Sequence, residues 1–157
     1  MRVINLLRSM HRQVVLDCGH ILDASVKEAL ECSDHVLVVT VLSFGFKHGI
    51  PVDSDLLFDV RFLPNPHFVP KLRAHTGRDR EVKAFLDKSP ATHDFLAHTL
   101  NLLRFLIPQY VAEGKTYLTI GIGCTGGRHR SVMIAEALKR SLAKVPGVRL
   151  RVKHRDS

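Results

Sequence analysis

The sequence contains no tryptophan and only three cysteines, at positions 18, 32 and 124. Cysteines so few and so widely spaced do not form the disulfide framework of a small secreted protein, so we expect reduced thiols and a cytoplasmic location. No apolar run approaches the length of a membrane span of about 18 residues, and Arg2 and Arg8 interrupt the apolar patch near the amino terminus. We therefore expect neither secretion nor contact with a membrane.

Acidic residues are scarce in the last fifth of the chain. Residues 128–157 contain 9 of the 23 Lys and Arg residues but only 2 of the 15 Asp and Glu residues, so most of the net charge of +8 lies there. A concentrated positive field of this kind attracts polyanions, nucleic acid first. The ten histidines show no paired spacing typical of a metal site. We expect neither a metal nor a cofactor.

Residues 115–131 are predicted to form a strand, a glycine-rich turn and the start of a helix. Thr116 to Ile122 is β-branched, aromatic and apolar, as expected for a buried strand. Helical periodicity of the apolar residues then starts at Ser131. A glycine turn between a strand and a helix directs backbone N–H groups toward an anion at the positive end of the helix dipole. Basic side chains at 128–130 add to this field, so the segment predicts a phosphate site.

Two known glycine motifs fit this turn only in part. Gly121 and Gly126 have the P-loop spacing, but Gly127 stands where that motif needs its lysine. Gly123 completes the dinucleotide-binding pattern Gly-x-Gly-x-x-Gly. That pattern needs an acidic residue at the end of the next strand, and the region 148–154 is basic instead.

A third motif, Cys-x-x-Gly-x-x-Arg-Ser, is met in full by Cys124, Gly127, Arg130 and Ser131. In cysteine-dependent phosphatases this spacing curls the backbone amides and the arginine around a phosphoryl group, with a thiolate beneath it. An enzyme of this kind would use Cys124 as the nucleophile, Arg130 as the clamp and Asp59 as a candidate acid. The phosphatase stays open as an alternative to a non-catalytic anion site.

Residues 12–40 resemble a fragment of a MinD/ParA-like ATPase. An apolar run at 13–16 is followed by Asp17, which falls on the position of a magnesium-binding aspartate in those proteins. No P-loop precedes it, so nucleotide hydrolysis is not predicted. Asp23 is expected to cap a helix to about Glu31, and Val36 to Leu42 to form a strand. We expect residues 1–40 to be a strand–helix–strand scaffold packed on the same sheet as the rest of the chain.

The remaining segments alternate between strand and helix patterns. Strands are predicted at 56–62, 116–122 and 148–152, and helices after Thr76, at 92–107 and from 131. Asp79, three residues after Thr76, indicates a capped helix start, and Pro108 indicates a kink or an end. Hydrophobic residues make up 45% of the 157 residues, enough for one domain with a sizeable core. The alternation predicts an α/β fold of three layers, with a mostly parallel sheet and helices on both faces.

Five motifs then identify a family. They are Ser-Phe-Gly-Phe-Lys-His-Gly-Ile-Pro at 43–51, Phe-Asp-Val-Arg-Phe-Leu-Pro-Asn-Pro-His at 58–67, Thr-Gly at 76–77, Gly-Cys-Thr-Gly-Gly-Arg-His-Arg-Ser at 123–131 and Val-Lys-His-Arg-Asp at 152–156. Together they resemble the C-terminal domain of the RapZ/YvcJ family, the RNase adapter proteins, over residues 41–157. The family's P-loop kinase-like domain has no counterpart here, so a truncated nucleotide-binding member that lacks its P-loop is a further alternative.

The resemblance implies a non-enzymatic adapter that binds small regulatory RNA, senses glucosamine-6-phosphate, presents RNA to an endoribonuclease and forms a homo-oligomer. Its pocket residues fall on Lys47, His48, His67, Thr125, Gly126, His129, Arg130 and Ser131. With the glycine turn, the full candidate set for a phosphosugar ligand also includes Cys124, Gly127 and Arg128. We expect Arg130 to pair with two phosphate oxygens. The family's basic tail predicts RNA contacts at Arg149, Arg151, Lys153, His154 and Arg155.

Overall fold

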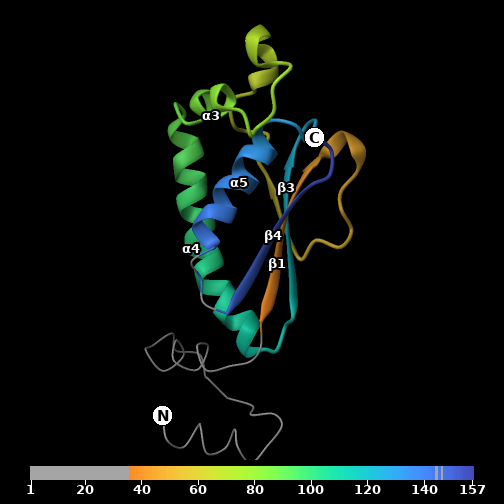
Figure 1. Cartoon of the computed structure of the whole chain (residues 1–157), viewed down its shortest axis with the longest axis vertical. Helices are drawn as coiled ribbons and strands as arrows, with labels where there is room; N and C mark the ends of the chain where they lie inside the picture. Colours follow the sequence, from red (N-terminus) through yellow and green to blue (C-terminus); the bar gives the residue numbers. More distant parts are fainter. Residues whose placement is uncertain (1–35, 144, 146) are drawn as a thin grey trace, which may run out of the picture.

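A parallel four-stranded sheet forms the centre of the computed structural model, which describes residues 36–143, 145 and 147–157. The order across the sheet is β2-β3-β1-β4, and every neighbouring pair is parallel (Figure 1). The strands are β1 (Leu37–Gly45), β2 (Leu56–Asp59), β3 (Tyr117–Cys124) and β4 (Val148–His154). The expected strand at 13–16, the helix at 23–31 and Asp17 lie outside the described residues.

The strands form where the sequence alternates or is continuously apolar. In β1, Leu37, Val39 and Val41 are buried against the helices, and their β-branched or bulky side chains suit a half-buried pleated surface. In β4 the apolar residues of the alternation pack on the same core, and the intervening basic residues stay exposed. Strands β2 and β4 therefore form the edges, and β1 and β3 the buried centre.

The described residues form three α-helices, α3 (Arg80–Leu86), α4 (Pro90–Ala112) and α5 (Arg130–Leu142). Helix α5 packs on the sheet, and α3 and α4 pack against α5. The apolar side of α5 lies over β1, β3 and β4 and is almost entirely buried. The Asp79 carboxylate accepts a hydrogen bond from the Thr76 amide at 2.6 Å, but α3 begins only at Arg80, so this pair closes the turn before the helix and does not cap it. Helix α4 does not end at Pro108, as the sequence suggested it could, because Ile107 and Val111 are both buried in the core and hold one further turn in place.

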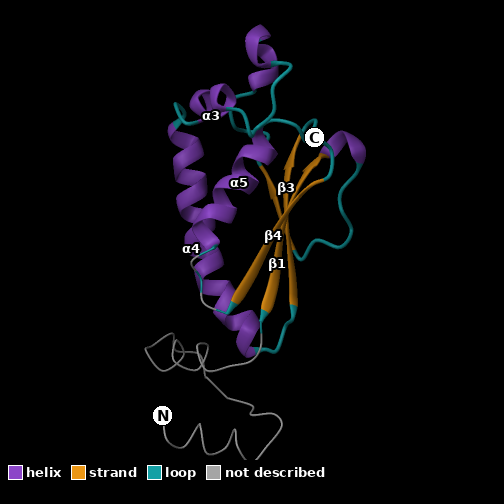
Figure 2. Ribbon diagram, viewed as in Figure 1, coloured by secondary structure: helices purple, strands orange, loops and turns teal. Residues whose placement is uncertain are grey.

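The predicted parallel α/β class is confirmed. Figure 2 shows the three α-helices on one side of the sheet. Within the described residues the other face carries no α-helix; it carries the segment 46–55, which includes the 3₁₀ turn η1 (Phe46–His48). A β-carbon on Gly121 would lie 2.9 Å from the Ser54 hydroxyl oxygen, so the glycine lets this segment lie close on β3. No helix in the described part of the chain is long and apolar enough to cross a membrane.

Candidate anion-binding site

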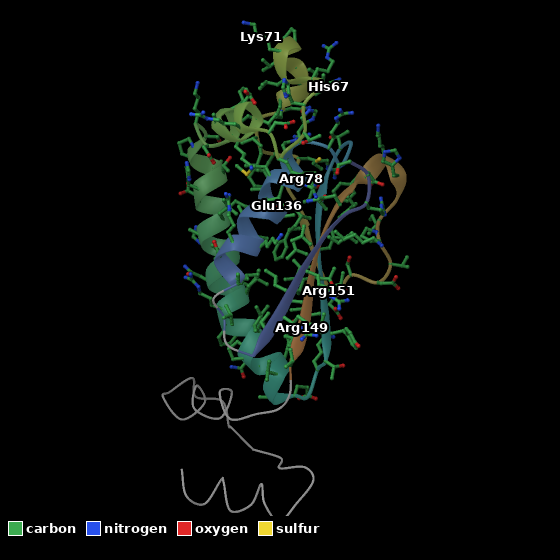
Figure 3. The ribbon with its side chains drawn as sticks, in the orientation of Figure 1. His67, Lys71, Arg78, Glu136, Arg149 and Arg151 are labelled. Atoms are coloured by element: carbon green, nitrogen blue, oxygen red, sulfur yellow. The ribbon has the colours of Figure 1, made fainter. Side chains whose placement is uncertain are left out.

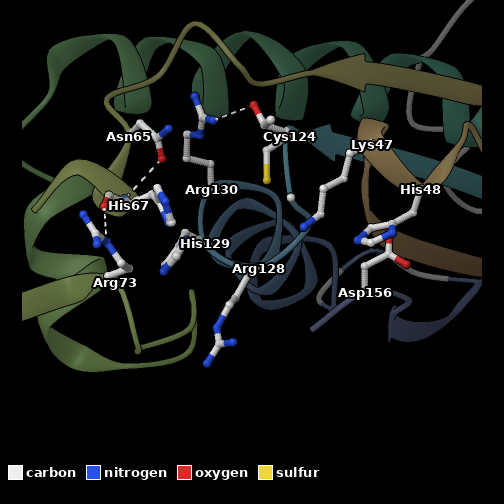
Figure 4. Close-up of a pocket in the computed structure, with 12 residues that line it drawn as sticks. Lys47, His48, Asn65, His67, Arg73, Cys124, Arg128, His129, Arg130 and Asp156 are labelled. Atoms are coloured by element: carbon white, nitrogen blue, oxygen red, sulfur yellow. Dashed lines mark hydrogen bonds between the residues drawn. The ribbon is translucent and has the colours of Figure 1, made fainter. Parts of the chain in front are cut away.

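A cavity of about 400 Å³ opens at the carboxyl ends of β1 and β3, where parallel α/β sheets commonly bind ligands (Figure 4). Nine of the residues predicted for the ligand site line it: Lys47, His48, His67, Cys124, Thr125, Gly126, Arg128, His129 and Arg130. The two others, Gly127 and Ser131, lie behind its wall and are buried. The structure thus gathers these predicted residues from three separate segments of the sequence.

The turn after β3 is held in shape by two glycines. Gly127 has φ +76°, a conformation that side chains disfavour. Its N–H donates a hydrogen bond to Cys124 Sγ at 3.3 Å, which folds the turn back over the end of the strand. Gly45, at the end of β1, supports the turn from below, since a β-carbon there would lie 2.5 Å from the carbonyl carbon of Gly126. The close approach of these two backbones fixes the floor of the cavity.

The turn offers several backbone donors to the cavity. Among the hydrogen bonds of the described residues, none uses the amide N–H of Thr125, Gly126, Arg128 or His129. Helix α5 begins at Arg130, so the positive end of its dipole adds to the same field. Lys47 reaches over the turn, because a β-carbon on Gly126 would lie 3.9 Å from its Nζ. Free amides and an ammonium group facing one space are the chemistry that binds an oxyanion.

Within the described residues, no carboxylate forms a salt bridge with Arg73 or Arg128, two arginines of the cavity. Arg73 Nε donates to the carbonyl of His67 at 3.2 Å, and Arg128 Nε to the carbonyl of His75 at 3.1 Å. Both acceptors are neutral, so these bonds orient the guanidinium groups without cancelling their charge. One carboxylate lines this cavity, that of Asp156.

The Asp156 carboxylate is held in the cavity wall by hydrogen bonds from the end of β1 and from the neighbouring Arg155. Its Oδ2 accepts hydrogen bonds from the Gly45 amide at 2.7 Å and from Arg155 Nη2 at 2.9 Å. Burial raises the pKa of this carboxyl, but the hydrogen bonds from Arg155 and the Gly45 amide outweigh burial and leave the pKa below its usual range. The group is therefore ionised at neutral pH, and it can face a cationic part of a ligand.

His129 contributes a neutral ring to the site. Burial lowers its pKa below 6.5, opposed by a hydrogen bond with the Leu72 carbonyl and helped by the nearby charge of Arg128. Nε2 lies 3.2 Å from that carbonyl oxygen, so Nε2 carries a proton, and the lowered pKa favours the neutral ring at pH 7. The sequence suggested three cations at positions 128–130; the structure leaves two.

Arg130 is only 4% exposed and is largely engaged by the protein itself. Its Nη1 donates to the carbonyls of Arg61 at 2.6 Å and Leu63 at 3.1 Å, and its Nη2 donates to Thr125 Oγ1 at 3.2 Å. Nη1 has used both of its hydrogens, so the expected pairing with two phosphate oxygens would have to use Nε and Nη2. The charge still faces the cavity, while the side chain ties the loop after β2 to the turn.

Cys124 lies at the floor of the cavity with a second polar neighbour, since its Sγ is 3.2 Å from Ser131 Oγ. Asp59, the candidate acid of a phosphatase, does not line the cavity. It forms an ion pair with Arg61 at 2.6 Å, and the hydrogen bond from Arg61 is the main cause of its lowered pKa. Asp59 is thus ionised at neutral pH and has no proton to donate.

The basic tail has two roles in this structure. His154 is buried between β1 and α5: its Nδ1 is 2.7 Å from Ser43 Oγ, and its Nε2 is 3.0 Å from Glu136 Oε1. Arg78 approaches the same carboxylate oxygen at 3.5 Å (Figure 3). Arg155 pairs with Asp156 and donates to the Gly49 carbonyl at 2.7 Å. The side chains of His154 and Arg155, both predicted to contact RNA, therefore bind other parts of the protein.

The other three tail residues, Arg149, Arg151 and Lys153, are exposed on alternate positions of the edge strand β4. Alternation places them on one face. Within the described residues none of them forms a salt bridge. They form an exposed row of cations in the region where the sequence predicted RNA contacts.

Sequence reasoning missed three residues of the cavity: Asn65, Arg73 and Asp156. Asn65 stands between two prolines and two residues before His67, so the rigid loop was a usable signal. Asp156 is the lone acid in a basic tail, which was a weaker one. Nothing local marks Arg73, because only the fold brings it to the cavity.

Comparison with known families settles the identity of this domain. The family description "RapZ C-terminal domain" matches residues 37–157, which include all four strands and the whole cavity. The chain belongs to the RapZ family.

Curated relatives of the RapZ family agree with this assignment, and the predicted resemblance is confirmed. A "nucleotide-binding protein" of Rubrobacter xylanophilus is 58% identical over 123 residues, covering 76% of this chain and 40% of the relative. Proteins of the same name from Trichlorobacter lovleyi and Moorella thermoacetica are 57% and 50% identical, covering 75% and 86% of this chain and 41% and 45% of the relatives. The chain thus spans less than half the length of these relatives.

Proposed function

We propose that this RapZ-family domain is a non-enzymatic module that senses an amino-sugar phosphate in the cavity and binds RNA for presentation to an endoribonuclease. The observation that carries the sensing role is the turn after β3, where no hydrogen bond of the described residues uses the amides of Thr125, Gly126, Arg128 and His129, beside Lys47. The family resemblance supplies the identity of the ligand, glucosamine-6-phosphate. It also supplies the RNA and the ribonuclease.

The cavity supports a ligand of this size and charge. A volume of about 400 Å³ is in the lower range of small-molecule sites. The phosphoryl group would bind the amides around Gly126 and the Lys47 ammonium, where positive charge is uncompensated. The ionised carboxylate of Asp156 would face the ammonium group of the sugar, and Asn65 and His67 would hydrogen-bond hydroxyl groups. Each part of the ligand thus meets a group of complementary chemistry.

Thermal shift and calorimetric titration test the ligand. We expect glucosamine-6-phosphate to stabilise the full chain by mass action, by about 2.7 kcal/mol at a ligand concentration of 100 Kd. Glucose-6-phosphate should bind more weakly, because it lacks the amine that faces Asp156. Lys47→Ala should weaken binding at least about tenfold, whereas the exposed Lys139→Ala on α5 should not. No binding by any sugar phosphate, or equal binding by Lys47→Ala, would overturn the sensing role.

The row of Arg149, Arg151 and Lys153 supports the RNA role. The affinity for a labelled single-stranded RNA should fall steeply with salt, because each phosphate contact releases counterions. Replacing all three residues by alanine should reduce the slope of log affinity against log salt by about 2, at roughly 0.7 per contact. Binding that is insensitive to both salt and these substitutions would contradict this interface.

A cysteine phosphatase is the second candidate, and the position of Cys124 favours it. The thiol lies at the cavity floor, 3.3 Å from the Gly127 amide and 3.2 Å from the Ser131 hydroxyl, both of which could stabilise a thiolate. The engaged Arg130 and the ionised Asp59 count against it. Hydrolysis of para-nitrophenyl phosphate that is lost in Cys124→Ser would establish the activity, and absence of turnover would exclude it for this substrate class.

A further inference from the structure

A long segment beside the cavity carries charge of one sign. Between Asp59 and Asp79 the sequence has no acidic residue, although it contains Arg61, Lys71, Arg73 and Arg78 and two histidines. A solvated surface of ordinary composition mixes both signs. The structure turns the middle of this segment into a projection above the cavity, made of the 3₁₀ turns η2 (Pro66–Phe68) and η3 (Pro70–Leu72).

The projection presents an exposed aromatic ring. Phe68 is 78% exposed, so its ring adds little to the core. The backbone around it is nevertheless firmly held: Pro66 and Pro70 fix two φ angles, and Asn65 accepts hydrogen bonds from the amides of His67 and Phe68, each at 3.2 Å. A rigid, solvent-exposed aromatic ring is a ready stacking surface, because little conformational entropy is lost when a partner covers it.

Cations lie on the same segment as this ring and at the cavity beside it. Lys71 lies at the far end of the projection (Figure 3), and within the described residues no carboxylate pairs with it. Arg73 and Arg128 lie on the side toward the cavity, where both bind neutral carbonyls and keep their charge. The acidic residue that ends the segment, Asp79, is already engaged by the Thr76 amide and by His75.

We infer that residues 66–73 form a second RNA-contacting surface at the mouth of the cavity, distinct from the row on β4. Phe68 stacks on an unpaired base, and Lys71 and Arg73 contact the flanking phosphates. Exposed aromatic rings set in a positive surface are how proteins bind single strands, since every base has a π-face and every nucleotide a negative charge. The inference rests on the proposed RNA role and names where and in what form the RNA binds.

Fluorescence anisotropy with a fluorescein-labelled, unstructured 20-nucleotide RNA and the full chain tests this surface. Phe68→Ala should weaken binding on the order of tenfold with the salt slope unchanged, and Phe68→Tyr should restore it, because stacking needs the ring. Lys71→Ala should lower the slope by about 0.7. The matched controls are Phe105→Ala, whose ring is 54% exposed on α4, and the exposed Lys88→Ala; neither should change binding.

The outcomes separate the two claims. If wild-type protein does not bind the RNA, the proposed RNA role fails and this inference fails with it. If wild type binds and the β4 triple variant loses affinity, but Phe68→Ala and Lys71→Ala do not, the RNA role stands and the inference is wrong. A labelled poly-glutamate peptide completes the test. Equal loss of peptide and RNA binding in Phe68→Ala would show a general polyanion surface and overturn the stacking.

Discussion

Replacing Arg130 with methionine tests whether the buried guanidinium stabilises the folded protein or serves only to bind the ligand. Methionine has nearly the same length and no charge. In the structure the guanidinium makes three hydrogen bonds, two of them to the carbonyls of Arg61 and Leu63. No other hydrogen bond of the described residues reaches these two carbonyls. The substitution therefore leaves two acceptors in or near the core without donors.

The magnitude follows from those bonds. Hydrogen bonds from a charged donor contribute about 1.5–3 kcal/mol each, and they are not additive within one network. We expect Arg130→Met to lower the free energy of unfolding by about 3–5 kcal/mol in the absence of any ligand. For a chain of 157 residues this corresponds to a fall in Tm of roughly 6–20 °C. Thr125→Val, which removes only the acceptor of Nη2, should cost about 1 kcal/mol.

Urea unfolding followed by circular dichroism measures the change, with differential scanning fluorimetry as a second readout. Arg140→Met on the exposed side of α5 is the matched control and should stay within about 0.5 kcal/mol of wild type. A ligand-free Tm within about 2 °C of wild type, together with lost ligand binding, would refute the reasoning. Arg130 would then act on the ligand alone, and its bonds to the carbonyls would contribute nothing to stability.

Two further predictions concern the supports of the cavity. Gly45→Ala should lower the free energy of unfolding by about 1–3 kcal/mol and abolish ligand binding, because its β-carbon would lie 2.5 Å from the Gly126 backbone. Gly126→Ala is the control and should stay folded, because its β-carbon meets only the Lys47 side chain, at 3.7 Å. Equal melting temperatures for the two variants would contradict this reasoning. Glu136 has a lowered pKa, chiefly through its hydrogen bond with His154. A carboxyl with a depressed folded pKa stabilises the protein above its unfolded pKa, near 4.5, and loses that contribution as the pH falls through the folded value. The stability difference between wild type and Glu136→Gln, measured by urea unfolding from pH 3 to 7, should therefore be constant above about pH 5 and shrink at lower pH; a difference that does not change with pH would contradict the ion-pair role.

Prediction from the sequence succeeded where the signal is local. The strand–turn–helix from Tyr117 to Leu142, with its glycines, follows from a change of hydrophobic period and from residues that can adopt φ > 0. The pairing of Thr76 with Asp79 is also local and is present, although α3 begins only at Arg80. An end of the helix at Pro108, one of the two predicted outcomes, is wrong, because burial of Ile107 and Val111 outweighs the local preference to end the helix.

The roles of the basic residues needed the tertiary structure. In the sequence, nothing distinguishes His154 and Arg155 from Arg149 and Arg151, so all four are predicted to be exposed cations of the tail. His154 and Ser43 are 111 residues apart, and so are Asp156 and Gly45; only the parallel pairing of β4 with β1 joins them. Charge at a position is a property of the residue, but whether that charge is free depends on what the fold places against it.

The sequence by itself determined that this chain has a phosphate-type turn between a strand and a helix, a basic carboxyl-terminal region and the motifs of the RapZ family, because each of these is written in neighbouring residues. Only the tertiary structure decided which groups the turn faces. It brought Asn65, Arg73 and Asp156 into the cavity, engaged Arg130 with two carbonyls and placed Lys47 beside the turn. The physical reason is that burial and hydrogen bonding depend on distance in space, which a linear chain fixes only after it has folded.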